Sequence, residues 1–337
     1  MNKDAVAELK IAIVILNWNG KKLLEQFLPS VIKHSKEATV YVADNASTDD
    51  SVSFLKTTYP LIDIIQNTTN GGYAKGYNDA LKDIEADIFC LLNSDVEVTK
   101  NWLPPIIETF TNEFNTAIIQ PKLLDFNKRD YFEYAGAAGG FIDKYGYPYC
   151  RGRIFNTIEK DNGQYNDTSE IFWASGACLF IRKQVFNEIN GLDEAFFAHM
   201  EEIDLCWRAK NLGYSIKYVG QSTIYHVGGA TLSNSNPQKT FLNFRNSLYT
   251  LTKNAKGNIL LIILMRLVLD GVAAIKFLVE IKPKHTLAIL KAHFSFYLHL
   301  KLLLSQRKLT KNKIVYYQNT SIVLGYFLYK RRFFKSL

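Results

Sequence analysis

Four short, largely apolar runs within the first hundred residues constrain the fold of this 337-residue chain more than any other feature. They lie at 11–16, 39–43, 62–65 and 87–92, and polar loops and helical periodicity separate each run from the next. Apolar runs of this length are typical of parallel strands that are buried on both faces. Their repetition predicts a doubly wound α/β domain, in which a mostly parallel sheet is flanked by helices and ligands bind beyond the carboxyl ends of the strands.

Beyond the fourth run the pattern is less regular. The segment 117–167 is rich in Gly and Tyr, and the polar stretch 159–169 is predicted to be a surface loop able to order over a ligand. Further strands are predicted at 172–181 and 215–219, and an amphipathic helix begins near residue 201.

Charge divides the chain into two regions, 1–236 and 237–337. From Gln238 to Leu337 there are 18 Lys and Arg residues against two acids, a net +16, while the remainder carries −8, which together give the overall +8. The basic region also carries long aliphatic runs, which are poor phosphate-binding surfaces, so nucleic acid is not an expected partner.

Helical periodicity in the C-terminal region favours amphipathic helices that lie on an anionic membrane surface. The segment 259–281 is long enough to span a bilayer, but four charged residues interrupt it and make a span costly. The alternative is a helical subdomain that packs on the N-terminal domain or on a second copy of the chain, as in a homodimer.

The cysteine pattern bears on the cellular compartment. Four cysteines lie far apart in the sequence, without metal-type spacing, and no secretory leader precedes the first strand. We therefore expect reduced thiols and a cytoplasmic protein, peripheral on the inner face of the cell membrane.

Polar residues follow several of the predicted strands. Asp44, Asn93 and Asp95 come directly after apolar runs, where a parallel sheet presents side chains to its ligand crevice. A hard divalent cation that bridges phosphates needs only one or two protein oxygens, and Asp95 is the first candidate ligand. His226 follows the last predicted strand, but its spacing alone does not make it a ligand.

Three carboxylates open the helix near residue 201. Glu201, Glu202 and Asp204 repel one another at this spacing, so their clustering indicates a cation, a helix N-terminus or a proton-transfer task. Asp204 and Arg208 lie one helical turn apart and are expected to pair.

Two common nucleotide-binding sequence patterns, the dinucleotide fingerprint and the P-loop, do not occur in this sequence. The glycine-rich segment 70–76 does not match the dinucleotide fingerprint and follows the third strand instead of the first, and no P-loop occurs. A third class with a similar arrangement of strands and acids is the sugar-phosphate nucleotidyltransferases. Their Gly-rich loop after the first strand is replaced here by Asn-Trp-Asn-Gly.

Six motifs in sequence order resemble those of family-2 glycosyltransferases of the rhamnosyltransferase-like bacterial type. The resemblance covers roughly residues 10 to 250. The motifs are Asn-Trp-Asn-Gly at 17–20, Asp-Asn-Ala-Ser-Thr-Asp at 44–49, Asn-Gly-Gly-Tyr-Ala-Lys-Gly-Tyr-Asn at 70–78, Leu-Asn-Ser-Asp at 92–95, Gly-Leu-Asp-Glu at 191–194 and Glu-Glu-Ile-Asp-Leu-Cys-Trp-Arg at 201–208.

The resemblance implies a GT-A fold and a nucleoside diphosphate sugar as donor. Asn17 and Asn19 would line the nucleoside pocket, and Asp44 would bind the base. Asn70 and Asn78 would also belong to the donor site.

Asn93-Ser94-Asp95 occupies the place of the family's Asp-X-Asp element, with Asn in the first acid position. The resemblance makes Asp95 a ligand of Mn²⁺ or Mg²⁺ and leaves Asn93 to hydrogen-bond the donor. It also matches His226 to the family's metal-contacting histidine.

The resemblance places Glu202 at the position of the general base, with Glu201 as its rival and Asp204 beside them. Inversion at the anomeric carbon needs a base on the face opposite the leaving diphosphate, and a carboxylate is sufficient. Trp173, Ser175 and Gly176 are candidates for contact with the acceptor sugar.

The expected function is an inverting glycosyl transfer from a UDP- or dTDP-type sugar to a hydroxyl of a lipid-linked or polysaccharide acceptor in cell-surface glycan synthesis. Two alternatives stay open. The departures at Asn93 and Glu202 are compatible with a catalytically inactive protein that binds nucleotide sugars or carbohydrates, and a nucleotidyltransferase would instead release pyrophosphate from a nucleoside triphosphate.

Overall fold

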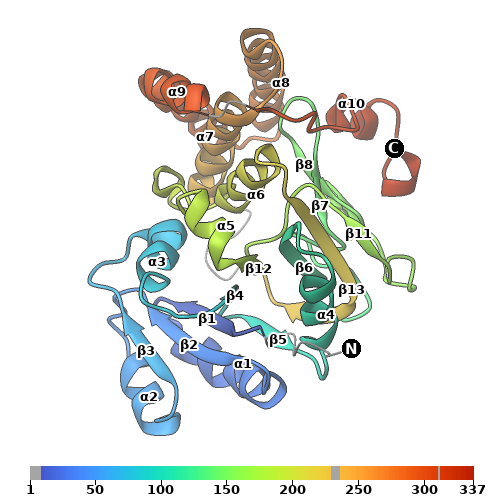
Figure 1. The fold of residues 1–337 in the computed structure, drawn as a ribbon. Helices are drawn as coiled ribbons and strands as arrows, with labels where there is room; N and C mark the ends of the chain where they lie inside the picture. The colour runs from blue at the N-terminus through green and yellow to red at the C-terminus, as the bar shows by residue number, and fades with distance from the viewer. Residues whose placement is uncertain (1–8, 229–235, 310–311) are drawn as a thin grey trace.

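The computed structural model of the chain describes residues 9–228, 236–309 and 312–337. Its centre is a large mixed sheet (Figure 1). The strands of this sheet are β1 (Ile11–Asn17), β2 (Thr39–Asp44), β3 (Asp63–Gln66), β4 (Ile88–Asn93), β5 (Val96–Val98), β6 (Thr116–Asp125), β11 (Thr168–Glu170), β12 (Cys178–Arg182) and β13 (Ser215–His226).

Ten α-helices are found in the described parts of the chain. In chain order they are α1 (Lys21–His34), α2 (Ser51–Thr58), α3 (Gly72–Ala80), α4 (Pro104–Asn112), α5 (Lys183–Glu188), α6 (Glu201–Asn211), α7 (Pro237–Asn254), α8 (Ile259–Val279), α9 (Pro283–Leu309) and α10 (Ile322–Phe327).

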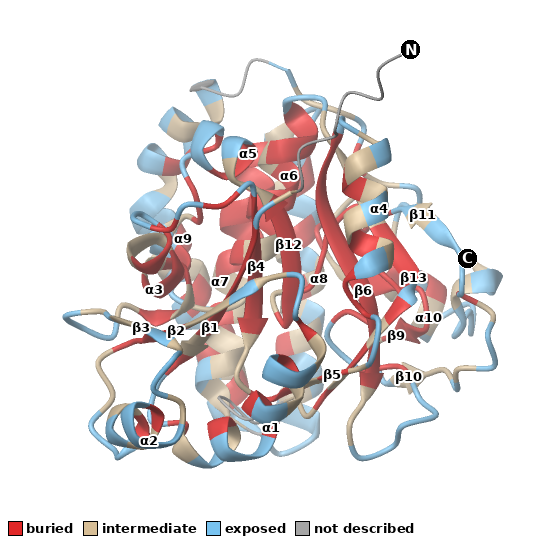
Figure 2. Ribbon diagram, turned by 60° about the horizontal axis from the view of Figure 1, so that its bottom comes forward, coloured by how far each residue is buried: buried red, intermediate tan, exposed pale blue. Residues whose placement is uncertain are grey.

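The four apolar runs form the parallel half of the sheet, as predicted. The strand order is β11-β13-β6-β12-β4-β1-β2-β3, with β5 beside β13. β1 to β4 are mutually parallel, β6 and β13 are parallel to each other, and β12 runs antiparallel between β4 and β6. The inner strands β4, β6 and β12 are almost entirely buried (Figure 2). The predicted doubly wound sheet flanked by helices is confirmed.

A second, antiparallel sheet accounts for much of the irregular middle segment. It consists of β7 (Gly140–Ile142), β8 (Pro148–Cys150), β9 (Arg153–Ile154) and β10 (Thr157–Ile158), in the order β10-β9-β8-β7.

Two expectations for the middle of the chain need correction. Of the strand predicted at 172–181 only β12 forms, because residues 172–177 make a buried loop. The polar stretch 159–169 is anchored instead of free. Its end enters β11, Tyr165 is buried, and Asp161 forms an ion pair of 2.8 Å with the buried Lys122.

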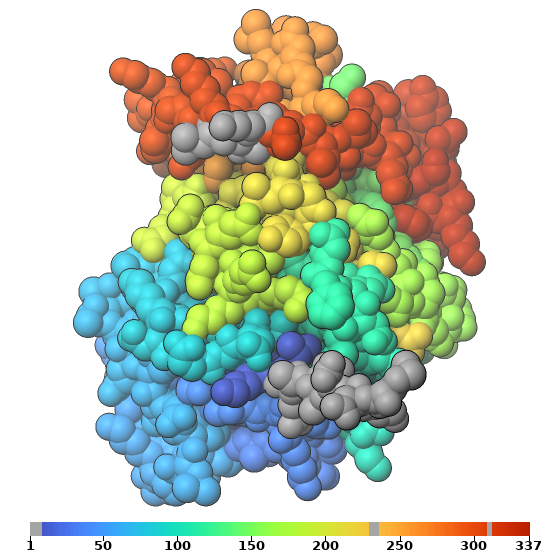
Figure 3. Space-filling view, in the orientation of Figure 1, coloured from blue at the N-terminus to red at the C-terminus, as the bar shows by residue number. Residues whose placement is uncertain are grey.

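The C-terminal helices share a core with the sheet. Leu248 of α7, Ile262 of α8 and Phe296 of α9 belong to the same buried cluster as side chains of β1 and β4. In Figure 3 the C-terminal region forms a layer across one end of the molecule, in contact with the parts below it. The described residues on either side of the expected boundary at 236/237 therefore do not pack as separate cores.

The charges that interrupt 259–281 do not all face outward. Arg266 and Asp270 are buried and form an ion pair of 2.7 Å, and Tyr147 donates a hydrogen bond to Asp270. The outer side of α8 is apolar: Leu264 and Val272 are each more than half exposed. Among the described helices, α9 is long and apolar enough to cross a membrane, although 28% of its most apolar window is buried.

Candidate active site

The first wall of the candidate site is built by the ends of β1 and β2. Asn17 and Asp44 are register partners, and the Asn17 Nδ2 donates to Asp44 Oδ1 at 3.1 Å. The backbone N–H of Ser47 donates to the other Asp44 oxygen at 3.0 Å. A Cβ at Gly20 would lie 2.5 Å from Asn17 Oδ1, so this close approach of the loop requires glycine. The Asp44 carboxylate is thus fixed by Asn17 at the end of β1 and by Ser47 in the loop after β2.

Asn19 organises the loop that follows β2. Its backbone adopts a φ of 51°, and its side-chain oxygen accepts a hydrogen bond of 2.7 Å from the N–H of Thr48. Its own N–H donates to Ser47 Oγ at 2.9 Å. The two predicted nucleoside-binding loops are therefore fastened to each other.

The glycine-rich motif divides into two groups of contacts. Asn70 Oδ1 accepts hydrogen bonds from Asn45 Nδ2 at 2.9 Å and from the N–H of Gly72 at 3.0 Å, close to the β2 end. Asn78 instead exchanges hydrogen bonds with both backbone groups of Leu192, at 2.8 and 2.9 Å. Asn78 therefore ties α3 to the 191–194 motif, a geometry that favours a structural role over its predicted contact with the donor.

Asp95 and His226 meet at the end of β13. The Asp95 Oδ1 lies 3.2 Å from His226 Nε2, and both side chains are buried. On the other side of the imidazole, Glu133 Oε1 lies 3.3 Å from Nδ1, without hydrogen-bond geometry. The structure thus brings the two predicted metal ligands together and adds a second carboxylate, Glu133. Asn93, two residues before Asp95 in the sequence, ends β4 and is half-buried.

The electrostatics of this pair suit a cation. Burial alone would lower the pKa of His226, but the charge of Glu133 and the hydrogen bond with Asp95 raise it to about 10. Burial likewise opposes ionisation of Asp95, yet the interactions with His226 lower its pKa. These opposite shifts show that the two buried carboxylates favour a positive charge at the position of His226.

The donor set fits a phosphate-bridging ion. No cluster of three or more His, Cys, Asp or Glu side chains forms a complete metal site in the parts of the chain that the structure describes. An ion that takes one or two protein ligands and completes its coordination with phosphate oxygens and water needs only a partial site, such as Asp95 with His226.

The acidic helix α6 is preceded by a strained segment. Phe197, His199 and Met200 all have φ between 63° and 72°, a region that side chains rarely adopt. The side chain of Asn246 on α7 donates hydrogen bonds to three carbonyls of this segment, at 2.7 to 3.1 Å. Such strain persists where the surrounding structure enforces it, and it is common at functional sites.

The two glutamates at the start of α6 differ in environment. Burial, together with the charge of Glu202, raises the pKa of Glu201 well above its usual value. Burial also raises the pKa of Glu202, but backbone N–H groups at the helix start limit the rise to about 7. One oxygen of each carboxyl is buried without a hydrogen-bond partner. Near neutral pH, Glu202 is therefore poised to exchange a proton, which makes it the better candidate for the base.

Tyr73 links the surroundings of these glutamates to the end of β4. The charges of Glu201 and Glu202 contribute to the raised pKa of Tyr73, and its hydroxyl donates to the carbonyl of Gly176 at 2.8 Å. The next residue, Ala177, accepts a hydrogen bond from the N–H of Asn93 at 3.0 Å. The base candidates and the end of β4 thus border on the same loop.

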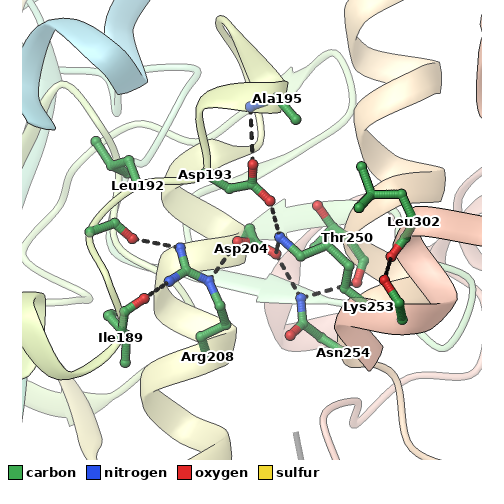
Figure 4. Close-up of polar contacts among 12 residues, drawn as sticks. Ile189, Leu192, Asp193, Ala195, Asp204, Arg208, Thr250, Lys253, Asn254 and Leu302 are labelled. Carbon is green, nitrogen blue, oxygen red and sulfur yellow. Dashed lines mark hydrogen bonds and ion pairs between the residues drawn. The ribbon is translucent and has the colours of Figure 1, made fainter. Parts of the chain in front are cut away.

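Asp204 is the centre of a buried ionic network (Figure 4). Arg208 Nε lies 2.7 Å and Lys253 Nζ 2.9 Å from its carboxylate, and Asn254 donates a hydrogen bond of 2.8 Å. Burial would raise the pKa of Asp204, but Lys253 and Arg208 lower it to about 2. Lys253 also pairs with Asp193. The expected Asp204–Arg208 pair is present, and these contacts favour an anchoring role for Asp204 over proton transfer.

The acceptor candidates lie in the buried loop before β12. Trp173 is buried, its indole covers Gly140, and its Nε1 donates to the carbonyl of Phe141 at 2.8 Å. This position argues against stacking of Trp173 on a sugar. The N–H of Ser175 donates to Gln120 at 2.7 Å, and Gly176 contacts Tyr73. Their predicted contact with the acceptor stays a prediction.

Three residues of the site carried no signal in the sequence. Glu133 lies in the irregular middle segment, and Asn246 and Lys253 belong to the C-terminal region, which was expected to stand apart. The packing of α7 against α6 and the strained segment brings Asn246 and Lys253 to the site. Glu133 is placed beside β6, where its N–H donates to the carbonyl of Leu123.

Comparison with known proteins agrees with this geometry. The family model described as "Glycosyl transferase family 2" matches residues 12–189. An N-acetylglucosaminyl-diphospho-decaprenol L-rhamnosyltransferase of Mycobacterium tuberculosis is 23% identical over 235 residues, which cover 64% of this chain and 75% of the relative.

Two solved structures share the fold at low sequence identity. The structure of GalNAc-T7 with UDP, GalNAc and Mn²⁺ superimposes with a TM-score of 0.58 at 15% identity, over 74% of this chain and 48% of the other. The mannosyltransferase PcManGT of Pyrobaculum calidifontis, in complex with GDP-Man and Mn²⁺, gives 0.51 at 13% identity, over 90% and 74%. Together with the family match over more than half of its length, these findings show that the chain belongs to glycosyl transferase family 2, with the GT-A fold.

Proposed function

We propose that this glycosyltransferase moves a sugar, with inversion, from a UDP- or dTDP-type donor to a hydroxyl of a lipid-linked or polysaccharide acceptor in cell-surface glycan synthesis. The observation that carries the proposal is the meeting of Asp95 and His226 at 3.2 Å, close to Asn93, whose N–H bonds the loop that Tyr73 also contacts. Burial raises the pKa of Glu202 to about 7, which suits a general base. The lipid-linked acceptor is supported by the name of the mycobacterial relative.

In this proposal the residues divide the work. Asn17, Asn19 and Asp44 bind the nucleoside, and Asn93 hydrogen-bonds the ribose or the sugar. Asp95 and His226 hold Mn²⁺ or Mg²⁺, which when bound stabilises negative charge on the leaving diphosphate. Glu202 accepts the proton of the acceptor hydroxyl as that oxygen attacks the anomeric carbon from the opposite face.

A donor screen tests the proposal directly. UDP-, GDP- and dTDP-sugars are added to the protein with Mn²⁺ or Mg²⁺, and thermal stability and release of nucleoside diphosphate are measured. We expect a metal-dependent rise in melting temperature and slow hydrolysis with one donor, and loss of both in Asp95→Ala because the metal loses a carboxylate ligand. Asp63→Ala, at the exposed start of β3, is the matched control and should behave as wild type. A wild-type protein that binds none of these donors would contradict the proposal.

We further propose that α8 and α9 hold the enzyme on the inner face of the cell membrane, as a cytoplasmic, peripheral protein. The buried pair Arg266–Asp270 removes two charges from the outer side of α8. Exposed lysines such as Lys284 and Lys291 accompany the apolar side chains of α9, and suit anionic headgroups.

Vesicle binding tests the membrane contact in the full-length chain. Because α7 to α9 share the main core, truncation is not a clean experiment. We expect the combined change Leu264→Glu and Val272→Glu to abolish co-sedimentation with phosphatidylglycerol vesicles, since each change puts a negative charge in place of an exposed apolar side chain that would enter the membrane. Leu61→Glu, between α2 and β3 at the far end of the molecule, is the control and should bind normally. If the double variant instead binds vesicles as wild type does, and only breaks an oligomer in lipid-free buffer, the helices form a homodimer interface.

A further inference from the structure

Arg153 differs from the other buried cations of the described structure. Six Lys and Arg residues are buried there, and five of them form ion pairs with Asp or Glu. The five are Lys122, Arg151, Lys210, Lys253 and Arg266. Arg153, with 6% of its surface exposed, has no carboxylate within 4.0 Å among the described residues. A buried charge without an opposite charge is unfavourable unless something else compensates it.

The β8–β9 hairpin places this arginine. Cys150 and Arg153 are paired across the hairpin, and Arg151 and Gly152 form its turn. Gly152 has a φ of 88°, and a Cβ there would lie 2.7 Å from the ring of Phe132. Arg151 forms an ion pair with Asp167, whereas Arg153 contacts the carbonyl and the ring of Tyr134. The tight turn thus gives two neighbouring arginines different surroundings.

The hydrogen bonds of Arg153 leave part of its guanidinium unused. Nε donates to the carbonyl of Tyr134 at 2.8 Å, Nη2 lies 3.6 Å from the sulfur of Cys150, and the guanidinium carbon lies 4.5 Å from the centre of the Tyr134 ring. Burial raises the pKa of the Cys150 thiol to about 11, so this thiol is neutral and does not compensate the charge. Nη1 has no hydrogen-bond partner in the described part of the chain.

Arg153 lies beside the metal-binding half of the candidate active site. The carbonyl that its Nε bonds at 2.8 Å belongs to Tyr134, the residue after Glu133, and the Glu133 carboxylate faces His226 at 3.3 Å. The neighbour of Arg153, Cys150, interacts electrostatically with Glu202. A substrate that spans the metal pair and the base would therefore pass close to this guanidinium.

We propose that Arg153 binds a phosphate group of a substrate in the active site, as a residue that contacts the diphosphate of the donor or that of a lipid-linked acceptor. A guanidinium offers paired N–H donors that match phosphate oxygens, and the charge-assisted contact would also compensate the buried cation. This inference rests on the proposed function, because it takes its ligand from that reaction.

Binding of diphosphates by full-length Arg153 variants tests the proposal. UDP and dTDP, with Mn²⁺, probe the donor source, and farnesyl diphosphate probes the lipid source; uridine, thymidine and farnesol lack the phosphates and serve as reference ligands. We expect Arg153→Gln to weaken one class of diphosphate by about tenfold or more, and to leave the reference ligands unchanged. Arg153→Lys keeps the charge, so it should fold well and restore part of the affinity.

Arg151→Gln is the matched control, because it changes the adjacent arginine that Asp167 neutralises; it should not alter diphosphate affinity. Loss of UDP or dTDP affinity assigns the donor diphosphate, and loss of farnesyl diphosphate affinity alone assigns the acceptor. If wild type binds these diphosphates and folded Arg153→Gln binds them equally well, the inference is wrong while the proposed function stands. Wild-type protein that binds no nucleoside diphosphate would instead defeat the proposed function.

Discussion

Replacing Glu202 with glutamine is expected to lower sugar transfer by roughly 10²- to 10⁴-fold, the usual contribution of a general base. Glutamine keeps the size and position of the side chain but cannot accept the acceptor's proton. Donor binding, followed by thermal shift with the nucleotide sugar, should be retained because the change lies away from Asn17 and Asp44. If sugar transfer is unchanged in Glu202→Gln, Glu202 is not the general base. If neither protein transfers sugar, the result favours a protein that only binds nucleotide sugars.

Glu201→Gln is the control that separates the two neighbouring glutamates. Burial and the charge of Glu202 raise the pKa of Glu201 well above its usual value, which favours its protonated form. Glutamine imitates a protonated glutamate closely, so we expect less than about a tenfold loss of transfer in this variant. The opposite order of effects would identify Glu201 as the base.

The pH dependence of Glu202 links activity to stability. Its pKa in the folded chain, about 7, lies above the usual value of 4.5. The stabilisation that protonated Glu202 provides is therefore complete below pH 4.5 and is lost as the pH rises through 7. Over the same interval kcat/KM should rise, because the base ionises. Glu202→Gln should accordingly melt several degrees above wild type at pH 8, although it has lost transfer, and both should melt alike at pH 4.5.

The first half of the fold could be predicted because its strands are buried on both faces. Burial of this kind produces continuous apolar runs, and β1 to β4 begin and end within one or two residues of the predicted limits. The same signal fails at 172–177, where an apolar stretch forms a buried loop. Its backbone groups bond to Gly140 and to the side chain of Gln120 rather than to a strand ladder, and an apolar pattern cannot distinguish the two.

The candidate site could be predicted only as far as strand ends define it. Asp95 and His226 were expected near the sheet edge, and they lie 3.2 Å apart. Glu133, Asn246 and Lys253 could not be found this way, because their positions depend on the packing of the irregular segment and of α7. The charges in 259–281 were interpreted as obstacles to a membrane span, but Arg266 and Asp270 are turned inward.

Replacing Asp204 with alanine is expected to lower the free energy of unfolding by about 3–5 kcal/mol, the cost of breaking a buried ion pair. The carboxylate is fully buried and neutralises Lys253 and Arg208, which would be left without it. Urea unfolding at pH 7 measures the change. In wild type the stabilisation from Asp204 is present above pH 3.8 and is lost as the pH falls towards 2, since its folded pKa is about 2.

A double-mutant cycle shows whether this loss comes from the unpaired cations or from packing. Lys253→Met removes the cation that joins Asp204 to Asp193, and should cost about 3 kcal/mol because both acids lose a partner. For the cycle, Asp204→Asn replaces Asp204→Ala because it keeps the size of the side chain. The double variant Asp204→Asn/Lys253→Met should lose less free energy of unfolding than the two single variants together, by roughly 1–3 kcal/mol, because no ionised Asp204 then remains where the lysine was removed. Lys276→Met breaks the exposed helix pair with Glu280 and should change stability by less than about 1 kcal/mol. Strict additivity in the cycle would mean that Lys253 and Asp204 contribute independently to the free energy of unfolding.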